Sequence, residues 1–476
     1  MKKSNLALVI AAIAGGALSF FAMRAFSPGE AAPATTPAEH AGQPVAPLPS
    51  NEGALEEAIR FYRARVTRDP EDTRSQNALA GHYLQRVRET GNEDDLPLAL
   101  AAARASLAAV PAEQNFGGLT ALAHAEFANH DFAAARAHAL QLVALRPDRR
   151  DSYAALGDAC LELGDYEGAA DAFAQMAGRG GKDIGTETRL ARWAMLRGQT
   201  QEARQHFLTA LALLRDLPQP PREPVAWCHW QLGETAFAIG AYAAAESHYQ
   251  DALIVAPDSF RALGSMGRLR AAHGDLPAAI LLYEQASRLA PSVDFMGALG
   301  DLYRLSGREK EAAARYELAE QLGEHSRKVH GTPHDRALAN FYANHDLKPE
   351  EAYALARGEY DAGRRDIYGA DALAWTALKS GRIAEAQTAI IEALRLGTQD
   401  ARLLYHAGMI ARVAGDMPAA VDFLRPALTL NPHFDPLQSA IARKAVVAGG
   451  VDPGRSGARP NLNKPGSAPP ATTPPK

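Results

Sequence analysis

The stretch WCHWQLGETAFAIGAYAAAESHYQDALIVAP, which runs from Trp227 to Pro257, decides the fold of this chain. It contains two tryptophans, one cysteine, two histidines and three carboxylates, so it allows three interpretations: an active site, a metal site or a repeating structural unit. Its small residues Gly233 and Ala245 lie twelve positions apart. Because this spacing recurs along the chain, the stretch is first of all one copy of a repeat.

The repeat has a nearly constant length. Successive copies of the small-residue pair are 34 residues apart or close to it, except for two enlarged steps. Such self-similarity predicts a stack of similar units rather than one large core. The other copies of the pair are Ala123 with Ala135, Gly157 with Ala169, Ala191 with Ala203, Gly267 with Ala279, Gly300 with Ala312, Asn340 with Ala352, Ala374 with Ala386, and Gly408 with Ala420.

The residue types indicate that each copy is a pair of helices, because apolar residues follow helical periodicity in almost every window. We call the first helix of each pair helix A and the second helix B. The first small residue lies on helix A and the second on helix B, and their small size lets the two helix axes approach closely. An aromatic residue four positions later, such as Tyr249, is expected to fill the gap to the next hairpin. A glycine such as Gly240 ends helix A, and a proline such as Pro257 stops helix B.

Two stretches resemble the tetratricopeptide repeat, in which a Leu-Gly pair, a Gly-x-Tyr turn, Ala, an aromatic residue and Pro hold fixed offsets. They are LGDACLELGDYEGAADAF, which begins at Leu156, and LGETAFAIGAYAAAESHYQDALIVAP, which begins at Leu232. The resemblance implies an all-α fold, a right-handed superhelical solenoid of about ten helix hairpins with helices A on its concave side. The region from Gly369 to Pro436 also resembles a group of exported bacterial tetratricopeptide repeat proteins of unassigned activity.

Residues 1–26 indicate export. The run from Leu6 to Met23 holds 18 uncharged residues, which is near the lower limit for crossing a bilayer core of about 30 Å and longer than the apolar part of a typical cleaved signal. It favours an uncleaved anchor in the inner membrane, with Lys2 and Lys3 on the cytoplasmic side and the rest of the chain facing the periplasm. The alternative is a cleaved signal peptide, which releases a periplasmic or secreted protein.

The rest of the chain divides into three parts. Residues 27–50 form a Pro/Ala-rich linker and residues 448–476 a Pro-rich tail, and both are expected to be disordered because they have little apolar surface to bury. The solenoid occupies residues 51–447. A half-repeat from Ala58 to Pro70 precedes its hairpins, and a helix from about Pro436 to Val447 is expected to cap its other end.

The family's concave positions on helix A predict a partner-binding groove. They hold many Trp, Tyr and Arg residues, the types that carry most binding energy in protein interfaces, so the surface suits a protein or peptide partner. The other interpretation of the tryptophans, packing between hairpins, stays open. The predicted groove residues are Trp227, Trp230, Glu234, Phe237, Arg261, Arg268, Asp294, Asp301, Arg304, Phe341, Tyr368, Asp371, Trp375, Arg402, Tyr405 and Arg412.

Composition argues against several other functions. The formal charge is −5, from 50 basic and 55 acidic residues, so no overall positive field recruits nucleic acid. The two cysteines, Cys160 and Cys228, lie two repeats apart, too far for a disulfide, and are expected to be small buried hydrophobes. The sequence contains no recognisable catalytic motif and implies no cofactor.

Three histidines, His325, His330 and His334, lie close together in one enlarged step. We expect a polar loop between repeats there, whose histidines are solvated, although three imidazoles so close could bind a divalent transition metal. The sequence therefore favours a non-enzymatic scaffold that binds a protein or peptide on the extracytoplasmic side of the membrane. The alternative is a metal-binding accessory protein of an envelope transport system.

Overall fold

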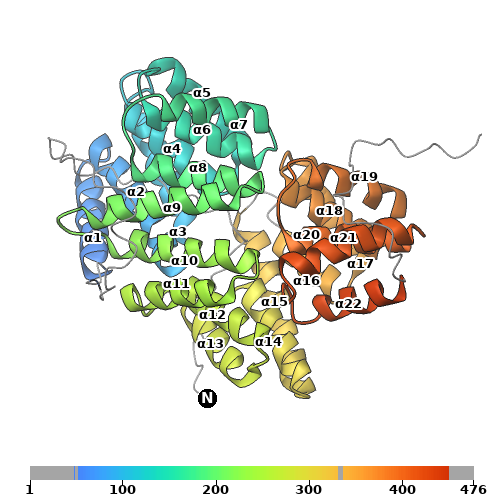
Figure 1. Ribbon diagram of the computed structural model, residues 1–476. Helices are drawn as coiled ribbons and strands as arrows, with labels where there is room; N and C mark the ends of the chain where they lie inside the picture. The colour runs from blue at the N-terminus through green and yellow to red at the C-terminus, as the bar shows by residue number, and fades with distance from the viewer. Residues whose placement is uncertain (1–47, 49–51, 331–335, 450–476) are drawn as a thin grey trace, which may run out of the picture.

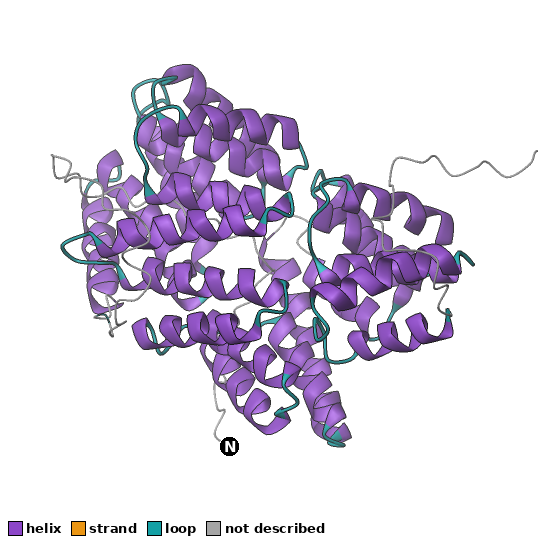
Figure 2. Ribbon diagram, viewed as in Figure 1, coloured by secondary structure: helices purple, strands orange, loops and turns teal. Residues whose placement is uncertain are grey.

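The computed structural model describes residues 48, 52–330 and 336–449. Helices are the only regular elements in this part of the chain, and there are 22 of them (Figures 1 and 2). The expected signal segment 1–26, the linker 27–50 except Leu48, and the tail from residue 450 lie outside the described residues. Within the described ranges, no helix combines the length and apolar character that a membrane span needs.

Twenty of the helices pair into ten hairpins, and one helix flanks the array at each end. Packing is strongest within hairpins and between neighbours along the chain, as expected for a one-dimensional stack. The flanking helices are α1 (Glu52–Arg68) and α22 (Gln438–Ala448). The hairpins are α2 (Thr73–Thr90) with α3 (Asp95–Ala109), α4 (Phe116–Ala128) with α5 (Phe132–Leu145), α6 (Arg150–Glu162) with α7 (Tyr166–Ala177), α8 (Ile184–Leu196) with α9 (Thr200–Arg215), α10 (Arg222–Ala238) with α11 (Tyr242–Val255), α12 (Phe260–Ala272) with α13 (Leu276–Leu289), α14 (Val293–Leu305) with α15 (Glu309–His330), α16 (Arg336–Asn344) with α17 (Pro349–Asp361), α18 (Ile367–Lys379) with α19 (Ile383–Leu394), and α20 (Ala401–Val413) with α21 (Met417–Leu430).

The turns inside the hairpins confirm the predicted role of glycine at the end of helix A. Gly164 and Gly240 have φ angles of 73° and 70°, a left-handed conformation that costs glycine little. Where the sequence lacks glycine, His130 takes the same conformation with a φ of 62°. An aspartate then caps many of the helices B; the carboxylate of Asp165, for example, accepts the N–H of Gly168 at the start of α7.

The small residues bring the two helices of each hairpin together, and the aromatic ring on helix B lies over the small residue of helix A. A Cβ atom on Gly233 would lie 2.4 Å from the ring of Tyr249, and one on Gly300 would lie 2.2 Å from the ring of Tyr316. The ring therefore covers the glycine of its own hairpin and also packs against the next hairpin, as predicted: the ring centre of Tyr316 lies 5.8 Å from that of Phe341 on α16. Side chains on a helix lean toward its N-terminus, which carries the ring back over helix A.

The array turns far enough for its C-terminal hairpins to lie against hairpins six repeats earlier (Figure 1). Hydrogen bonds in three successive hairpins mark this inter-turn seam. The N–H of Ile367 donates to the Tyr166 hydroxyl (2.7 Å), the Thr398 hydroxyl donates to the carbonyl of Leu196, and the Asn431 amide donates to the carbonyl of Phe237 (2.7 Å). In each contact, the end of one hairpin's helix A or the start of its helix B meets a segment that connects a later hairpin to the next helix or begins that helix.

One enlarged step differs from the prediction. Instead of a polar loop, α15 continues to His330, so His325 lies on a half-buried helical position. The segment from Glu324 to Lys328 contains good helix formers and no Pro or Gly. Gly323 is tolerated in the helix because Leu338 of α16 packs against it, 2.8 Å from where a Cβ atom would lie.

Candidate partner-binding surface

Several predicted groove residues join consecutive helices A through ion pairs. The carboxylate of Glu234 on α10 pairs with Arg268 on α12, 34 residues later, at 2.6 Å. Asp371 on α18 contacts His406 on α20 at 2.8 Å. Asp301 on α14 contacts His345, which follows α16, at 2.9 Å. Carboxylates on one helix A therefore bind cationic or imidazole groups of the next, which fixes the stacking of the repeats.

The Glu234 carboxylate accepts hydrogen bonds from several side chains as well as pairing with Arg268. The Glu234 carboxylate accepts hydrogen bonds from Tyr249 (2.6 Å), Ser265 (2.7 Å) and Arg268, and the Arg268 guanidinium lies 4.1 Å from the ring centre of Phe237. Burial alone would raise the pKa of Glu234, but the charge of Arg268 and these hydrogen bonds hold it below its ordinary value. With its acceptors occupied, Glu234 is a structural group that links two repeats.

The aromatic residues predicted for the groove are mostly core. Trp375 is 2% exposed, stacks on His406 with ring centres 4.2 Å apart, and donates to Asn344 (2.9 Å). Tyr405 is also 2% exposed and packs 5.5 Å from Phe434. These side chains offer no surface to a partner in this conformation. Phe237 and Phe341 are likewise buried in hydrophobic clusters, and Asp301 and Asp371 are buried in the pairs described above.

Trp227 and Trp230 are half-buried. The ring of Trp227 packs edge-on against Phe207 of α9 at 5.9 Å, and Trp230 donates its indole N–H to Ser265 of α12 (2.9 Å). Both tryptophans thus pack between hairpins, as the alternative interpretation holds, with part of each ring left exposed.

Four predicted residues occupy the second position of their helix A and remain accessible to solvent: Arg261 on α12, Asp294 on α14, Tyr368 on α18 and Arg402 on α20. We call them the concave row. Asp294 is exposed, yet burial raises its pKa to about 6 against the opposing charge of Arg402. Surrounding protein atoms therefore limit the hydration of the Asp294 carboxylate, although the side chain itself is exposed. Asp294 and Arg402 belong to hairpins three repeats apart, and the charge of Arg402 nevertheless lowers the pKa of Asp294, as expected if both lie on the concave side that the repeat family implies.

Tyr368 and Arg261 also combine access to solvent with a pKa that burial shifts. Burial raises the pKa of Tyr368 well above its usual value although the side chain is 37% exposed. Burial also lowers the pKa of Arg261 to about 10, and its guanidinium donates to the carbonyl of Arg88 on α2 (2.9 Å), five hairpins away. The remaining predicted groove residues, Arg304 and Arg412, are exposed at the ends of their helices.

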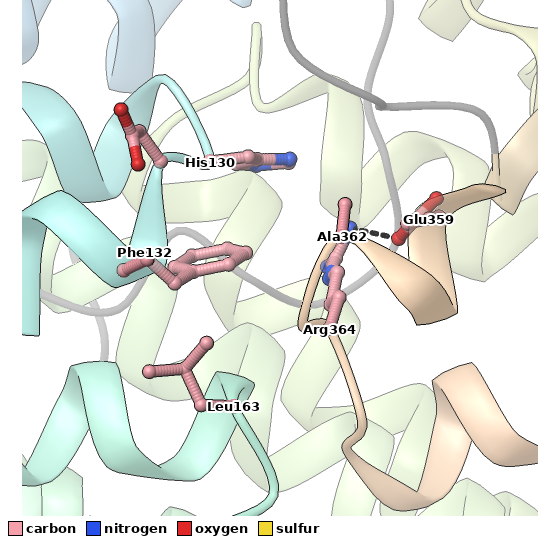
Figure 3. Close-up of a pocket in the computed structure, with 8 residues that line it drawn as sticks. His130, Phe132, Leu163, Glu359, Ala362 and Arg364 are labelled. Atoms are coloured by element: carbon pink, nitrogen blue, oxygen red, sulfur yellow. Dashed lines mark hydrogen bonds and ion pairs between the residues drawn. The ribbon is translucent and has the colours of Figure 1, made fainter.

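The prediction missed a buried charge network at the inter-turn seam. Arg364, 5% exposed, contacts Glu359 at 2.7 Å and Glu162 of α6 at 3.3 Å. Burial alone would raise the pKa of Glu162, but Arg192 and Arg364 hold it below its ordinary value. Figure 3 shows the adjoining pocket, where Phe132 and Leu163 face Arg364 across the seam. No sequence signal marks these partners, because they lie about 200 residues apart.

The structure describes two of the three histidines of the enlarged step. His325 is half-buried on α15, His330 is the last residue of that helix, and His334 lies outside the described residues. Metal binding by this cluster stays a prediction. The two cysteines are confirmed as free and buried, and burial raises the pKa of both thiols.

The fold defines a class of protein, the α-helical repeat solenoid. Models of the tetratricopeptide repeat match residues 120–184, 184–258, 230–292, 264–326 and 372–433, which together make up more than half of the chain. The chain therefore belongs to the tetratricopeptide repeat family. The models describe a repeat and not a catalytic domain, in keeping with a protein that serves in protein interactions.

Similarity to individual proteins is weaker. A solved structure titled "Crystal structure of MamA" is 22% identical, and the match covers 36% of this chain and 97% of that one. Its TM-score of 0.30 is too low to add to the argument about the fold. No curated protein matches the sequence.

Proposed function

We propose that this protein is a non-enzymatic scaffold that binds a segment of another protein along its concave row. The observation that carries the proposal is that Asp294, Tyr368 and Arg402 occupy the same helical position in three hairpins and remain accessible to solvent, while burial raises the pKa of Asp294 and of Tyr368. Tyr and Arg supply much of the energy of protein interfaces, and partly desolvated charges discriminate strongly between partners.

The row also indicates what kind of segment fits. Arg261 and Arg402 are cationic, whereas Asp294 lies between them in the order of the repeats and carries a negative charge above about pH 6. A bound segment therefore needs both acidic and basic groups, with an apolar or planar group for Tyr368. An extended peptide suits this surface, because its side chains can reach successive repeats.

Site-specific photo-crosslinking in producing cells tests the proposal. A photoreactive phenylalanine analogue at position 368 is expected to form a covalent adduct with another protein. The matched control is position 391, because Ile391 is 61% exposed on helix B of the same hairpin. Adducts from position 368 alone support the concave row. No adduct at position 368, or equal adducts at both positions, would contradict it.

We further propose that the scaffold faces the periplasm on a membrane anchor. The basic start and the apolar run from Leu6 to Met23 support this location. The protein should stay with membranes through a carbonate wash, and protease should reach it only from the periplasmic side. N-terminal sequencing of the mature protein distinguishes an anchor from a cleaved signal, because cleavage would give a chain that begins near Ala32.

A further inference from the structure

The hairpin α10–α11 departs from the hairpin before it at one group of polar residues. In α8–α9, the His206 imidazole Nδ1 lies 2.7 Å from a carboxylate oxygen of Glu187. His248 occupies the same position relative to the repeat as His206, three residues after the second small residue, but the equivalent of Glu187 is His229. The carboxylate that pairs with the imidazole in one hairpin is thus replaced by a second imidazole in the next.

The hairpin α10–α11 does contain a carboxylate nearby, that of Asp251, one helical turn after His248. Asp251 follows His248 by three residues on α11 and occupies the position that Thr209 holds in the preceding hairpin. The Asp251 carboxylate lies 3.4 Å from Nδ1 of His229, and the two histidine rings have centres 6.2 Å apart. One ligand atom from each of His229, His248 and Asp251 lies within 4.8 Å of the other two.

Each of the two imidazoles has one ring nitrogen that makes no hydrogen bond. Nδ1 of His229 and Nδ1 of His248 are both buried and have no hydrogen-bond partner, and His229 itself is only 2% exposed. A buried polar atom without a partner costs free energy. A neutral imidazole with a free ring nitrogen is the form that binds metals.

We propose that His229, His248 and Asp251 form a binding site for a divalent transition ion of the zinc class, clamped between the two helices of the hairpin. Two imidazole nitrogens and one carboxylate oxygen are a ligand set that Zn²⁺ and its neighbours accept. His248 and Asp251 are half-buried, so they can adjust toward the ion, and the remaining coordination positions are left to water. This site is independent of the concave row.

Arg215 lowers the affinity of this site for the metal ion. Its guanidinium lies 3.1 Å from Nε2 of His229 and donates to that nitrogen, which places the proton of this neutral imidazole on Nδ1. Metal binding at Nδ1 displaces that proton, leaves Nε2 as the protonated nitrogen and turns Arg215 away. A glutamine at position 215 can accept a hydrogen bond from Nε2–H instead, and partners of this kind strengthen metal affinity by about 10–100-fold.

Titration of the full-length protein with Co²⁺ tests the site, because Co²⁺ gives strong visible bands when few ligands surround it. The background carries His325→Ala, His330→Ala and His334→Ala, which removes the other histidine cluster. The disabling variant is His229→Glu with Asp251→Thr, which recreates the arrangement of Glu187, His206 and Thr209 and should therefore fold. His206→Ala is the matched control.

We expect one bound Co²⁺ per chain in the background and in His206→Ala, displaced by Zn²⁺, and none in the disabling variant. Arg215→Gln should tighten binding at least about tenfold. The proposal is overturned if the background protein binds no Co²⁺, or if the bands survive in a disabling variant whose helical content is normal. A thermal unfolding curve in chelator, equal for the background and the variant, shows that loss of the bands reflects lost ligands.

Discussion

The hydroxyl of Tyr166 accepts a 2.7 Å hydrogen bond from the backbone N–H of Ile367, a residue 201 positions further along the chain. Other hydrogen bonds join the next two hairpins to later ones: the Thr398 hydroxyl donates to the carbonyl of Leu196, and the Asn431 amide donates to the carbonyl of Phe237. Three successive hairpins thus meet hairpins six repeats away in a constant register. The seam holds the array closed, so the curvature of the concave row does not depend on nearest-neighbour packing alone.

The buried network of the seam should contribute strongly to stability. Arg364→Ala leaves Glu162 and Glu359 buried without this partner, and loss of one member of a buried pair typically costs about 3–5 kcal/mol. Arg357→Ala, which removes an exposed arginine paired with Asp361 and Glu385, should cost less than about 1 kcal/mol. Urea unfolding of the two variants measures the difference. Equal losses would show that the seam is not a stabilising contact.

The glycines of helix A should tolerate no side chain where an aromatic ring covers them. Gly300→Ala places a Cβ atom 2.2 Å from Tyr316, and overpacking of this kind costs about 1–3 kcal/mol. Gly358 lies on α17 with nothing within 4 Å of its would-be Cβ. Gly358→Ala should therefore stabilise the chain by about 0.5–1 kcal/mol through its helix propensity. We expect Gly300→Ala to lower the thermal midpoint and Gly358→Ala to raise it. An unchanged midpoint in Gly300→Ala would contradict the close packing of Tyr316 on Gly300.

The repeat could be predicted from the sequence because its signals are local. Gly240 ends a helix and Gly233 admits a close neighbour wherever they stand in the chain, and their spacing within each unit identifies the hairpin. The seam could not be predicted in the same way. Whether Asn431 reaches Phe237 depends on small rotations added over six hairpins, and no short-range pattern encodes that sum.

Which of the predicted groove residues stay exposed could not be predicted well, because neighbouring positions on helix A alternate between exposed and buried. Trp375 fits the family's groove spacing but packs on His406 instead. The pair of Glu234 with Arg268 had a usable signal, since opposite charges one repeat apart on helix A lie next to each other in a stack. The structure leaves Asp294, Tyr368 and Arg402 of the concave row exposed, together with Arg304 and Arg412 at the ends of their helices.

Asp294 should make stability depend on pH. Its pKa is raised from 3.8 to about 6 in the folded chain, so the folded state holds a proton that the unfolded state releases. The stability from this group is therefore fully present below pH 3.8 and is lost as pH rises through about 6. Asp294→Asn should flatten the decline in unfolding free energy between these values. Asp171→Asn, which alters an exposed carboxylate on α7, is the control, and an equal effect of both changes would show that the surroundings of Asp294 do not raise its pKa.

The affinity of the captured partner for variants of the concave row tests the central claim most directly. Calorimetry with the partner identified by cross-linking at position 368 should give a Kd about 30-fold weaker for Tyr368→Ala, the scale of an interface hot spot. Arg402→Ala should weaken binding in the same direction, whereas Ile391→Ala on helix B should leave the Kd unchanged. A partner whose affinity falls with Ile391→Ala and not with Tyr368→Ala would show that the protein binds through its outer surface, contrary to this account.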